Sequence, residues 1–202
     1  MELIPYLRTM SVIELILCPD PVFRIHKFQD EWRPGKKRAY MDNGGGDSWQ
    51  LVFYHDSWSI LYGLNHESDL AAISNLPAHL KEVLPTELSM FPDDIGDWWH
   101  YVSFCYWYDP RSGQWNDGVA TAGFGEHLSR DTSDLVLLNG DRLEFCNFVE
   151  ELYECEISRE SVDLVFEHVP LTQQLVSELN AATLLTSIER EVRLIGYPNK
   201  SW

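Results

Sequence analysis

The sequence predicts an α+β fold in which an antiparallel sheet, built from the N-terminal two thirds of the chain, carries C-terminal helices packed on one face. Side chains alternate with a period of two in several segments before Val119, which is typical of strands. After Asp141 the apolar residues recur at steps of three and four, which is typical of helices. Strands followed by helices favour an α+β fold over an alternating parallel one. The 202 residues contain no repeat and no low-complexity linker, so we expect a single domain over residues 1–202.

The segment from Asp47 to Leu64 is expected to form a β-hairpin with a turn at residues 55–57. Large apolar side chains occupy every second position on both sides of that turn: Trp49, Leu51 and Phe53, and then Trp58, Ile60, Tyr62 and Leu64. A third strand is expected over residues 98–108, and because both of its faces are apolar it should be central in the sheet. Residues 109–113 predict a turn, after which residues 115–119 return as a fourth strand.

The helical part begins at Asp141, which forms a capping-box-like start with Glu144. One apolar stripe follows it down the first helix: Leu143, Cys146, Val149 and Tyr153. A second helix is expected over residues 159–168, started by Ser158 and stopped by Pro170. Its expected apolar stripe comprises Val162, Val165, Phe166 and Val169. Two more are expected over residues 171–179 and 184–195, ended by Asn180 and Gly196 respectively.

Charge and tryptophan are unevenly distributed along the chain. The net charge is -17, yet the first fifty residues hold seven acidic and seven basic residues and sum to zero. From Ala39 to Ser129 there are thirteen acidic residues, two basic ones and six of the eight tryptophans. Such a field repels phosphate, which excludes nucleic acids and anionic membranes as expected partners and favours a basic protein or a cation. The alternative is that the acidity serves solubility alone.

No segment of the sequence predicts export or membrane insertion. The most apolar early run, Val12 to Cys18, is short, carries Glu14 and follows no basic region, so we expect a cytoplasmic protein. The four cysteines, at positions 18, 105, 146 and 155, are widely spaced and form no Cys-x-x-Cys pair. We therefore expect reduced, mostly buried thiols, with no metal and no cofactor.

Two polar segments next to the predicted hairpin are candidate sites. Residues 43–47, Asn-Gly-Gly-Gly-Asp, resemble a phosphate loop but lack its Lys-Ser/Thr and lead into a strand, so we expect a structural turn in which Asp47 could still line a pocket. The segment His66-Glu67-Ser68-Asp69 is the most compact cluster of chemically capable side chains. Because neighbouring residues of a strand point to opposite faces, His66 and Glu67 converge on one substrate only if the chain turns there. Otherwise these side chains bind backbone groups and fix the loop.

The aromatic and basic residues each allow two interpretations. Most rings between Trp49 and Trp115 should lie in the core, but a central strand with rings on both faces leaves some to line a groove or an interface. The run Arg33-Pro34-Gly35-Lys36-Lys37-Arg38 is expected to be a solvated loop that partly offsets the acidic surface, because a nucleic-acid contact conflicts with the overall charge.

Three motifs occur in order along the chain: Asn-Gly-x-Gly-Asp at residues 43–47, His-Glu-Ser at 66–68 and Ile-Gly-Tyr-Pro at 195–198. Together they resemble a family of uncharacterised bacterial proteins to which no activity is assigned. The resemblance extends from Asn43 to Pro198, and its most specific elements are the second and third of these motifs. The family has Asp before the His-Glu-Ser triplet, where this chain has Asn65. The resemblance implies a bacterial origin but no activity.

Our leading hypothesis is a non-enzymatic, cytoplasmic protein-interaction module of bacterial origin, with immunity or antidote proteins as the nearest functional analogy. It would bind a basic partner through an acidic aromatic surface comprising Asp93, Asp94, Asp97, Trp98 and Trp115. The alternative is a small-ligand-binding protein or hydrolase-like enzyme with a pocket around His66, Glu67 and Asp47. A purely structural subunit is the third hypothesis, and the sequence leaves the oligomeric state open.

Overall fold

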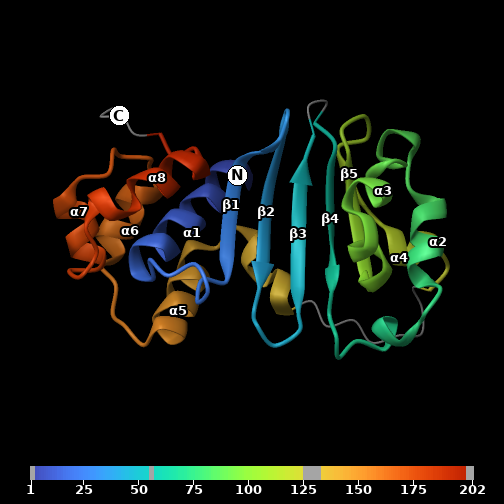
Figure 1. The fold of residues 1–202 in the computed structure, drawn as a ribbon, viewed down its shortest axis with the longest axis horizontal. Helices are drawn as coiled ribbons and strands as arrows, with labels where there is room; N and C mark the ends of the chain where they lie inside the picture. Colours follow the sequence, from blue (N-terminus) through green and yellow to red (C-terminus); the bar gives the residue numbers. More distant parts are fainter. Residues whose placement is uncertain (1–2, 55–56, 125–132, 199–202) are drawn as a thin grey trace. The chain divides into compact units, whose positions relative to one another are not determined.

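The computed structural model describes residues 3–54, 57–124 and 133–198 and divides the chain into two compact units. We call residues 1–32 with 135–202 the helical unit, and residues 33–134 the sheet unit. Six strands follow one another through a sheet in chain order, from β1 to β6 (Figure 1). Strands precede the C-terminal helices, which confirms the α+β fold. The expectation of one domain over residues 1–202 stays a prediction.

The helical unit is built around its first helix, α1 (Leu3–Leu17). Helices α5 to α8 all contact α1, and Figure 1 shows them around it. The remaining elements of the unit are β1 (His26–Arg33), η4 (Ser133–Asn139), α5 (Arg142–Tyr153), α6 (Arg159–Phe166), α7 (Gln173–Leu179) and α8 (Leu185–Ile195), where η4 and β1 each extend into the residues of the sheet unit. The four helices predicted after Asp141 are confirmed, each within a few residues of its expected ends.

Side-chain caps explain where three of the C-terminal helices, α5, α6 and α7, begin. The Asp141 carboxylate accepts hydrogen bonds from the backbone N–H groups of Leu143 and Glu144, at 2.8 and 3.2 Å. Ser158 and Thr172 cap α6 and α7 in the same way. Helix α8 ends at Gly196, whose φ of 74° is the left-handed conformation that glycine adopts most readily.

Two details of the predicted helical stripes are wrong. Leu143 is 62% exposed, so the first stripe of α5 faces inward through Phe145, Cys146 and Val149 instead. Val169 lies beyond the end of α6 and is 36% exposed. Both residues lie at or beyond a helix end, where the helical repeat no longer determines which side chains face the core.

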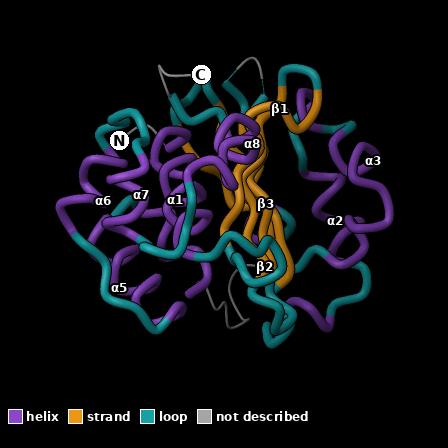
Figure 2. Tube along the Cα trace, turned by 60° about the vertical axis from the view of Figure 1, so that its left-hand side comes forward, coloured by secondary structure: helices purple, strands orange, loops and turns teal. Residues whose placement is uncertain are grey.

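The sheet unit contains five strands and several short helices. Its elements are β2 (Lys36–Asp42), β3 (Ser48–Phe53), β4 (Ser59–Leu64), η1 (Asp69–Ala72), α2 (Leu76–Val83), η2 (Thr86–Leu88), α3 (Phe91–Ile95), η3 (Gly96–Tyr101), β5 (Phe104–Asp109), β6 (Gln114–Asp117) and α4 (Gly118–Thr121). Strands β2 to β6 pair antiparallel with their neighbours. Figure 2 shows α2 and α3 on one side of these strands.

The predicted hairpin is confirmed as β3 and β4, in a register that pairs Leu51 with Leu61. Of its expected turn at residues 55–57, His55 and Asp56 lie outside the described residues, and Ser57 has a φ of 63°. The expected turn at residues 109–113 is also present, because the N–H of Gly113 donates to the carbonyl of Asp109 at 2.8 Å. The fourth predicted strand corresponds to β6, which is cut short where Asp117 caps α4.

The third predicted strand, over residues 98–108, is right in its second half and wrong in its first. Strand β5 pairs with both β4 and β6, so its central place in the sheet is confirmed. Residues 96–101 form the 3-10 helix η3 instead of a strand. Gly96, with a φ of 64°, ends α3 and redirects the chain so that Trp98 and Trp99 lie over Tyr62 of β4. The apolar residues at 98–101 therefore pack onto the sheet from a short helix and do not form part of a strand.

The basic run at residues 33–38 is a hairpin rather than the expected loop. Pro34 and Gly35 make a turn between β1 and β2, and Lys36 to Arg38 belong to β2. Gly35 has a φ of 66°, which suits the turn. Two of these cations, Arg33 and Lys36, contact Asp94 of the sheet unit, as described below, so they are held against the protein.

Candidate functional site

The glycine-rich segment is a turn between β2 and β3, as expected. Asn43 accepts hydrogen bonds through its side-chain oxygen from the N–H groups of Gly45 and Asp47, at 2.8 and 3.1 Å. Asp42 accepts another from the N–H of Gly44 at 2.9 Å. These side chains occupy the loop's own N–H groups, so the turn holds itself closed.

Asp47 and His66, two of the three residues of the alternative site, lie together at this turn. The Asp47 carboxylate accepts hydrogen bonds from the backbone N–H of His66 at 2.9 Å and from its Nδ1 at 2.7 Å. Partial burial raises the pKa of the Asp47 carboxyl, but the hydrogen bonds from His66 and Asn43 outweigh it and lower this pKa below its usual range. The chain therefore does turn at His66, and it orients the imidazole through Asp47.

Of the other residues of this cluster, Glu67 approaches the second nitrogen of His66 from solvent, and Ser68 binds the backbone. The Glu67 side chain is 83% exposed, and its Oε1 lies 3.9 Å from the His66 Nε2. Ser68 caps the short helix η1 by accepting from the N–H of Leu70 at 3.2 Å. The cluster thus holds an oriented Asp47–His66 pair, and its remaining side chains serve the local backbone or face solvent.

The proposed acidic partner surface centres on one short segment, residues 90–101. Phe91 and Trp99 are buried, and Trp99 Nε1 donates to the carbonyl of Pro77 at 2.8 Å. These two rings fix the segment against the sheet, while Met90 and Tyr101 are 68% and 65% exposed. The segment contains Asp93, Asp94 and Asp97, which are all exposed. The segment therefore combines exposed acidic side chains with exposed large apolar side chains within a short stretch of sequence.

Two of these three aspartates are ion-paired within the sheet unit. Asp93 lies 2.6 Å from Lys81 Nζ. Asp94 lies 2.9 Å from Lys36 Nζ and 3.8 Å from an Arg33 nitrogen, and its carbonyl oxygen accepts from Arg33 at 2.9 Å. The Asp97 side chain makes no hydrogen bond or ion pair with any residue that the structure describes. The segment's negative charge is therefore partly compensated by the protein's own cations.

The two tryptophans assigned to the partner surface differ in exposure. Trp98 is half-buried, with its ring edge against Tyr62 at 5.6 Å between centroids. Trp115 of β6 is 45% exposed and lies 5.7 Å from the ring of Tyr108. Among the other described tryptophans, Trp49, Trp58, Trp99 and Trp107 are buried.

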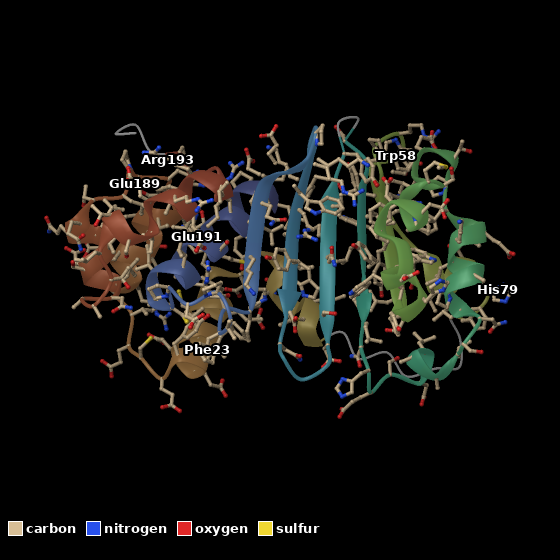
Figure 3. The ribbon with its side chains drawn as sticks, in the orientation of Figure 1. Phe23, Trp58, His79, Glu189, Glu191 and Arg193 are labelled. Atoms are coloured by element: carbon tan, nitrogen blue, oxygen red, sulfur yellow. The ribbon has the colours of Figure 1, made fainter. Side chains whose placement is uncertain are left out.

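Arg111 of the sheet unit contacts both an aromatic ring and carboxylates. The Arg111 guanidinium lies 4.8 Å from the ring centroid of Trp58, 3.0 Å from Glu87 and 3.1 Å from Asp109. Trp58 is one of the residues labelled in Figure 3. Arg111 and Lys81 are the two basic residues between Ala39 and Ser129, and both are engaged with acids of the same unit.

The helical unit contains a buried polar cluster that the sequence did not reveal. Glu14 of α1 is fully buried, and its carboxylate accepts hydrogen bonds from His26 Nδ1 at 2.6 Å, from the N–H groups of Ile25 and His26 at 3.1 Å each, and from the Tyr153 hydroxyl at 2.9 Å. Burial and the adjacent Glu14 raise the pKa of Tyr153. Four donors offset the cost of burying this carboxylate, so the cluster has a structural role.

Ion pairs on α8 show the contrast between exposed and buried cations. Glu189 and Arg193 pair at 2.8 Å on the exposed face, and Figure 3 shows them near each other. Glu191 instead pairs with Arg24 at 2.6 Å, and the Arg24 side chain is only 3% exposed.

Over residues 3–54, 57–124 and 133–198, no group of three or more His, Cys, Asp and Glu side chains is placed to hold a metal ion. No helix in those same ranges has the length and apolar character needed to cross a bilayer. The four cysteines are free thiols, with Cys105 and Cys146 buried and Cys18 and Cys155 partly exposed.

Comparisons with models of known protein families, with curated proteins and with solved structures give no match to this chain. The resemblance carried by residues 43–47, 66–68 and 195–198 therefore stays an interpretation of those motifs.

Sequence reasoning identified the three aspartates but missed the apolar side chains beside them. Met90 and Tyr101 flank the segment, and nothing in their spacing distinguishes them from core residues. The signal that could have found them is the pair of Pro92 and Gly96, which breaks any strand and predicts a short, partly exposed helical turn.

Proposed function

We propose that this protein is a non-enzymatic interaction module that binds a basic protein partner through the surface of residues 90–101. The observation that carries the proposal is that one short segment, residues 90–101, exposes Met90 and Tyr101 as well as Asp93, Asp94 and Asp97, and is anchored by buried rings. Exposed large apolar side chains within a charged rim are typical of protein interfaces. Trp98 and Trp115 are further candidates for contact, with Trp115 the more accessible.

The charge of the whole chain supports a basic partner. A net charge of -17 produces an attractive field for a positively charged protein, which raises the rate of encounter more than the lifetime of the complex. Cytoplasmic bacterial immunity or antidote proteins, which neutralise basic toxins, remain the nearest analogy. The proposal therefore includes a bacterial cytoplasmic location and a basic toxin-like partner.

The test is the association kinetics of a partner identified by cross-linking in the source cells. We expect Asp93→Asn, Asp94→Asn and Asp97→Asn together to slow association about tenfold at low salt, with little change at high salt. Met90→Ala with Tyr101→Ala should instead speed dissociation. The matched control is Glu151→Gln, Glu156→Gln and Glu160→Gln, which removes the same charge from exposed positions of the helical unit. Equal effects of the two triple variants would rule out this surface as the binding site.

A second candidate function is supported by one observation, the oriented pair of Asp47 and His66. A carboxylate 2.7 Å from an imidazole Nδ1, with the His66 side chain 44% exposed, is an arrangement that general bases use. Hydrolysis of a panel of activated esters should then be lost in His66→Ala and reduced in Asp47→Asn, measured at a temperature at which both variants remain folded. If the wild type hydrolyses none of the esters and the two variants are less stable, the pair instead has a structural role in the turn.

A further inference from the structure

Lys36 lies in a contact that combines a carboxylate with an aromatic ring. Its Nζ is 2.9 Å from Asp94 Oδ2 and 4.6 Å from the ring centroid of Tyr54. The Lys36 side chain is only 21% exposed, so its ammonium has left much of its water for these two groups. A carboxylate and a ring face are the two kinds of group that stabilise an ammonium most directly.

The groups that hold Lys36 belong to rigid parts of the sheet unit. Tyr54 follows β3 and packs edge-on against the buried Phe91, at 6.0 Å between ring centroids. Phe91 in turn opens the helix that carries Asp94. Phe91 therefore links Tyr54 to the helix of Asp94, and Arg33 also holds Asp94 by donating to its carbonyl oxygen at 2.9 Å.

Lys36 itself comes from a different kind of element. It follows the turn at Pro34 and Gly35 and opens β2. Its neighbour Lys37 points to the opposite face of β2, because side chains alternate along a strand, and pairs in register with Phe53. Lys36 is thus placed against Asp94 and Tyr54 by the hairpin, while an otherwise similar lysine is placed elsewhere.

We propose that Asp94 and Tyr54 form a lysine-binding clamp, which Lys36 occupies in the free protein and which a lysine of the partner takes over on binding. This inference rests on the proposed function and adds two points to it. The partner contributes a lysine side chain, and Lys36 of this protein competes with that lysine for the clamp. The contacts of Lys36 with Asp94 and Tyr54 are the ones that we expect the partner's lysine to make.

Displacement of Lys36 is energetically accessible. The Asp94 side chain is 38% exposed, and partly exposed ion pairs of this kind contribute little to stability. Once displaced, Lys36 regains its water at the exposed end of the hairpin. The competitor therefore weakens the partner's binding by a few fold and does not abolish it.

The test uses an octalysine peptide as probe and measures its affinity for variants of the full chain by fluorescence anisotropy at low salt. Lys36→Gln should bind the peptide about fivefold more tightly than Lys37→Gln, which changes the net charge equally. In an Asp94→Asn background the two lysine variants should bind equally, because the clamp is gone. Thermal melting of each variant checks that the sheet unit is intact.

The outcomes separate this inference from the proposed function. Equal affinities of Lys36→Gln and Lys37→Gln, with Asp94 present, overturn the clamp. If the triple aspartate variant still weakens peptide binding relative to its glutamate control, the surface stands without the clamp. A fivefold gain that persists after Asp94→Asn also overturns the clamp, because Lys36 would then act through general charge. Perturbation of the Tyr54 ring signals by the peptide in Lys36→Gln, and not in Lys36→Gln/Asp94→Asn, supports it.

Discussion

At the scale of residues, single side chains determine how closely neighbouring strands of the sheet unit can approach. Gly63 of β4 is the clearest case, because a Cβ there would lie 2.2 Å from the Ser48 carbonyl oxygen and 2.5 Å from the ring of Phe104. Neither atom belongs to the free end of a flexible chain, so a larger residue must move the backbone or the ring. The close pairing of β4 with β3 and β5 thus requires glycine at this position.

We expect Gly63→Ala to lower the free energy of unfolding by about 3 kcal/mol, because the added methyl group overpacks the sheet. Chemical denaturation followed by tryptophan fluorescence measures the change. Gly45→Ala is the control, since its Cβ would come no closer than 3.3 Å to Asn43, and it should cost much less. Similar losses in the two variants would contradict the packing argument.

The Asp47–His66 pair makes stability depend on pH. The pKa of Asp47 is lower in the folded protein than its ordinary value, so the folded state holds the proton less tightly than the unfolded chain. The resulting stabilisation is present above the unfolded pKa of about 4 and is lost as pH falls through the folded pKa. Asp47→Asn should therefore reduce stability at pH 7 and approach the wild type as pH falls below about 4. A difference from wild type that stays constant from pH 7 to pH 2 would exclude this linkage.

At the scale of elements, side-chain caps determine where α5, α6 and α7 begin. Asp141 satisfies two N–H groups of α5 that would otherwise lack partners. Asp141→Ala should lower the free energy of unfolding by about 1 kcal/mol. Leu143→Ala, two residues later, should change it by less than about 0.5 kcal/mol because Leu143 is 62% exposed. A larger loss from Leu143→Ala than from Asp141→Ala would restore the stripe that the sequence predicted.

Elements with a regular pattern were predictable, and elements that depend on tertiary packing were not. The hairpin of β3 and β4 and the helices α5 to α8 follow from period and caps alone. Helix α1 was not predicted, because it buries ten residues around its whole circumference, including Glu14, and its sequence therefore shows no single apolar stripe. The hairpin before Lys36 was hidden by consecutive cations, which the apolar alternation of a strand does not include.

The candidate site was predictable in composition but not in arrangement. The sequence marked Asp47, His66 and the three aspartates as chemically notable residues. It could not indicate that Asp94 is held by Lys36, because the contact joins residues 58 positions apart in the sequence. Contacts of this kind arise only when the hairpin and α3 are placed against the same ring cluster.

At the scale of the whole molecule, the helical unit is assembled from two distant parts of the chain. Residues 1–32 supply α1, and residues 135–202 supply the helices that contact it. A chain that ends at Asp134 should therefore leave the apolar surface of α1 uncovered. We expect such a chain to bind a hydrophobic dye strongly and to lose protection of its α1 amides against hydrogen exchange, compared with the full chain. Protected α1 amides in the shortened chain would show that α1 folds without its partners.

This discontinuity has a consequence during synthesis. Helix α1 leaves the ribosome early, whereas α5 begins at Arg142, so translation at roughly 5–20 residues per second leaves α1 waiting for about 6–25 s. Throughout that interval one of the most apolar helices of the chain has none of its helical neighbours. The nascent chain therefore offers a binding site for chaperones that the finished protein conceals, and the yield of folded protein in cells should depend on their supply.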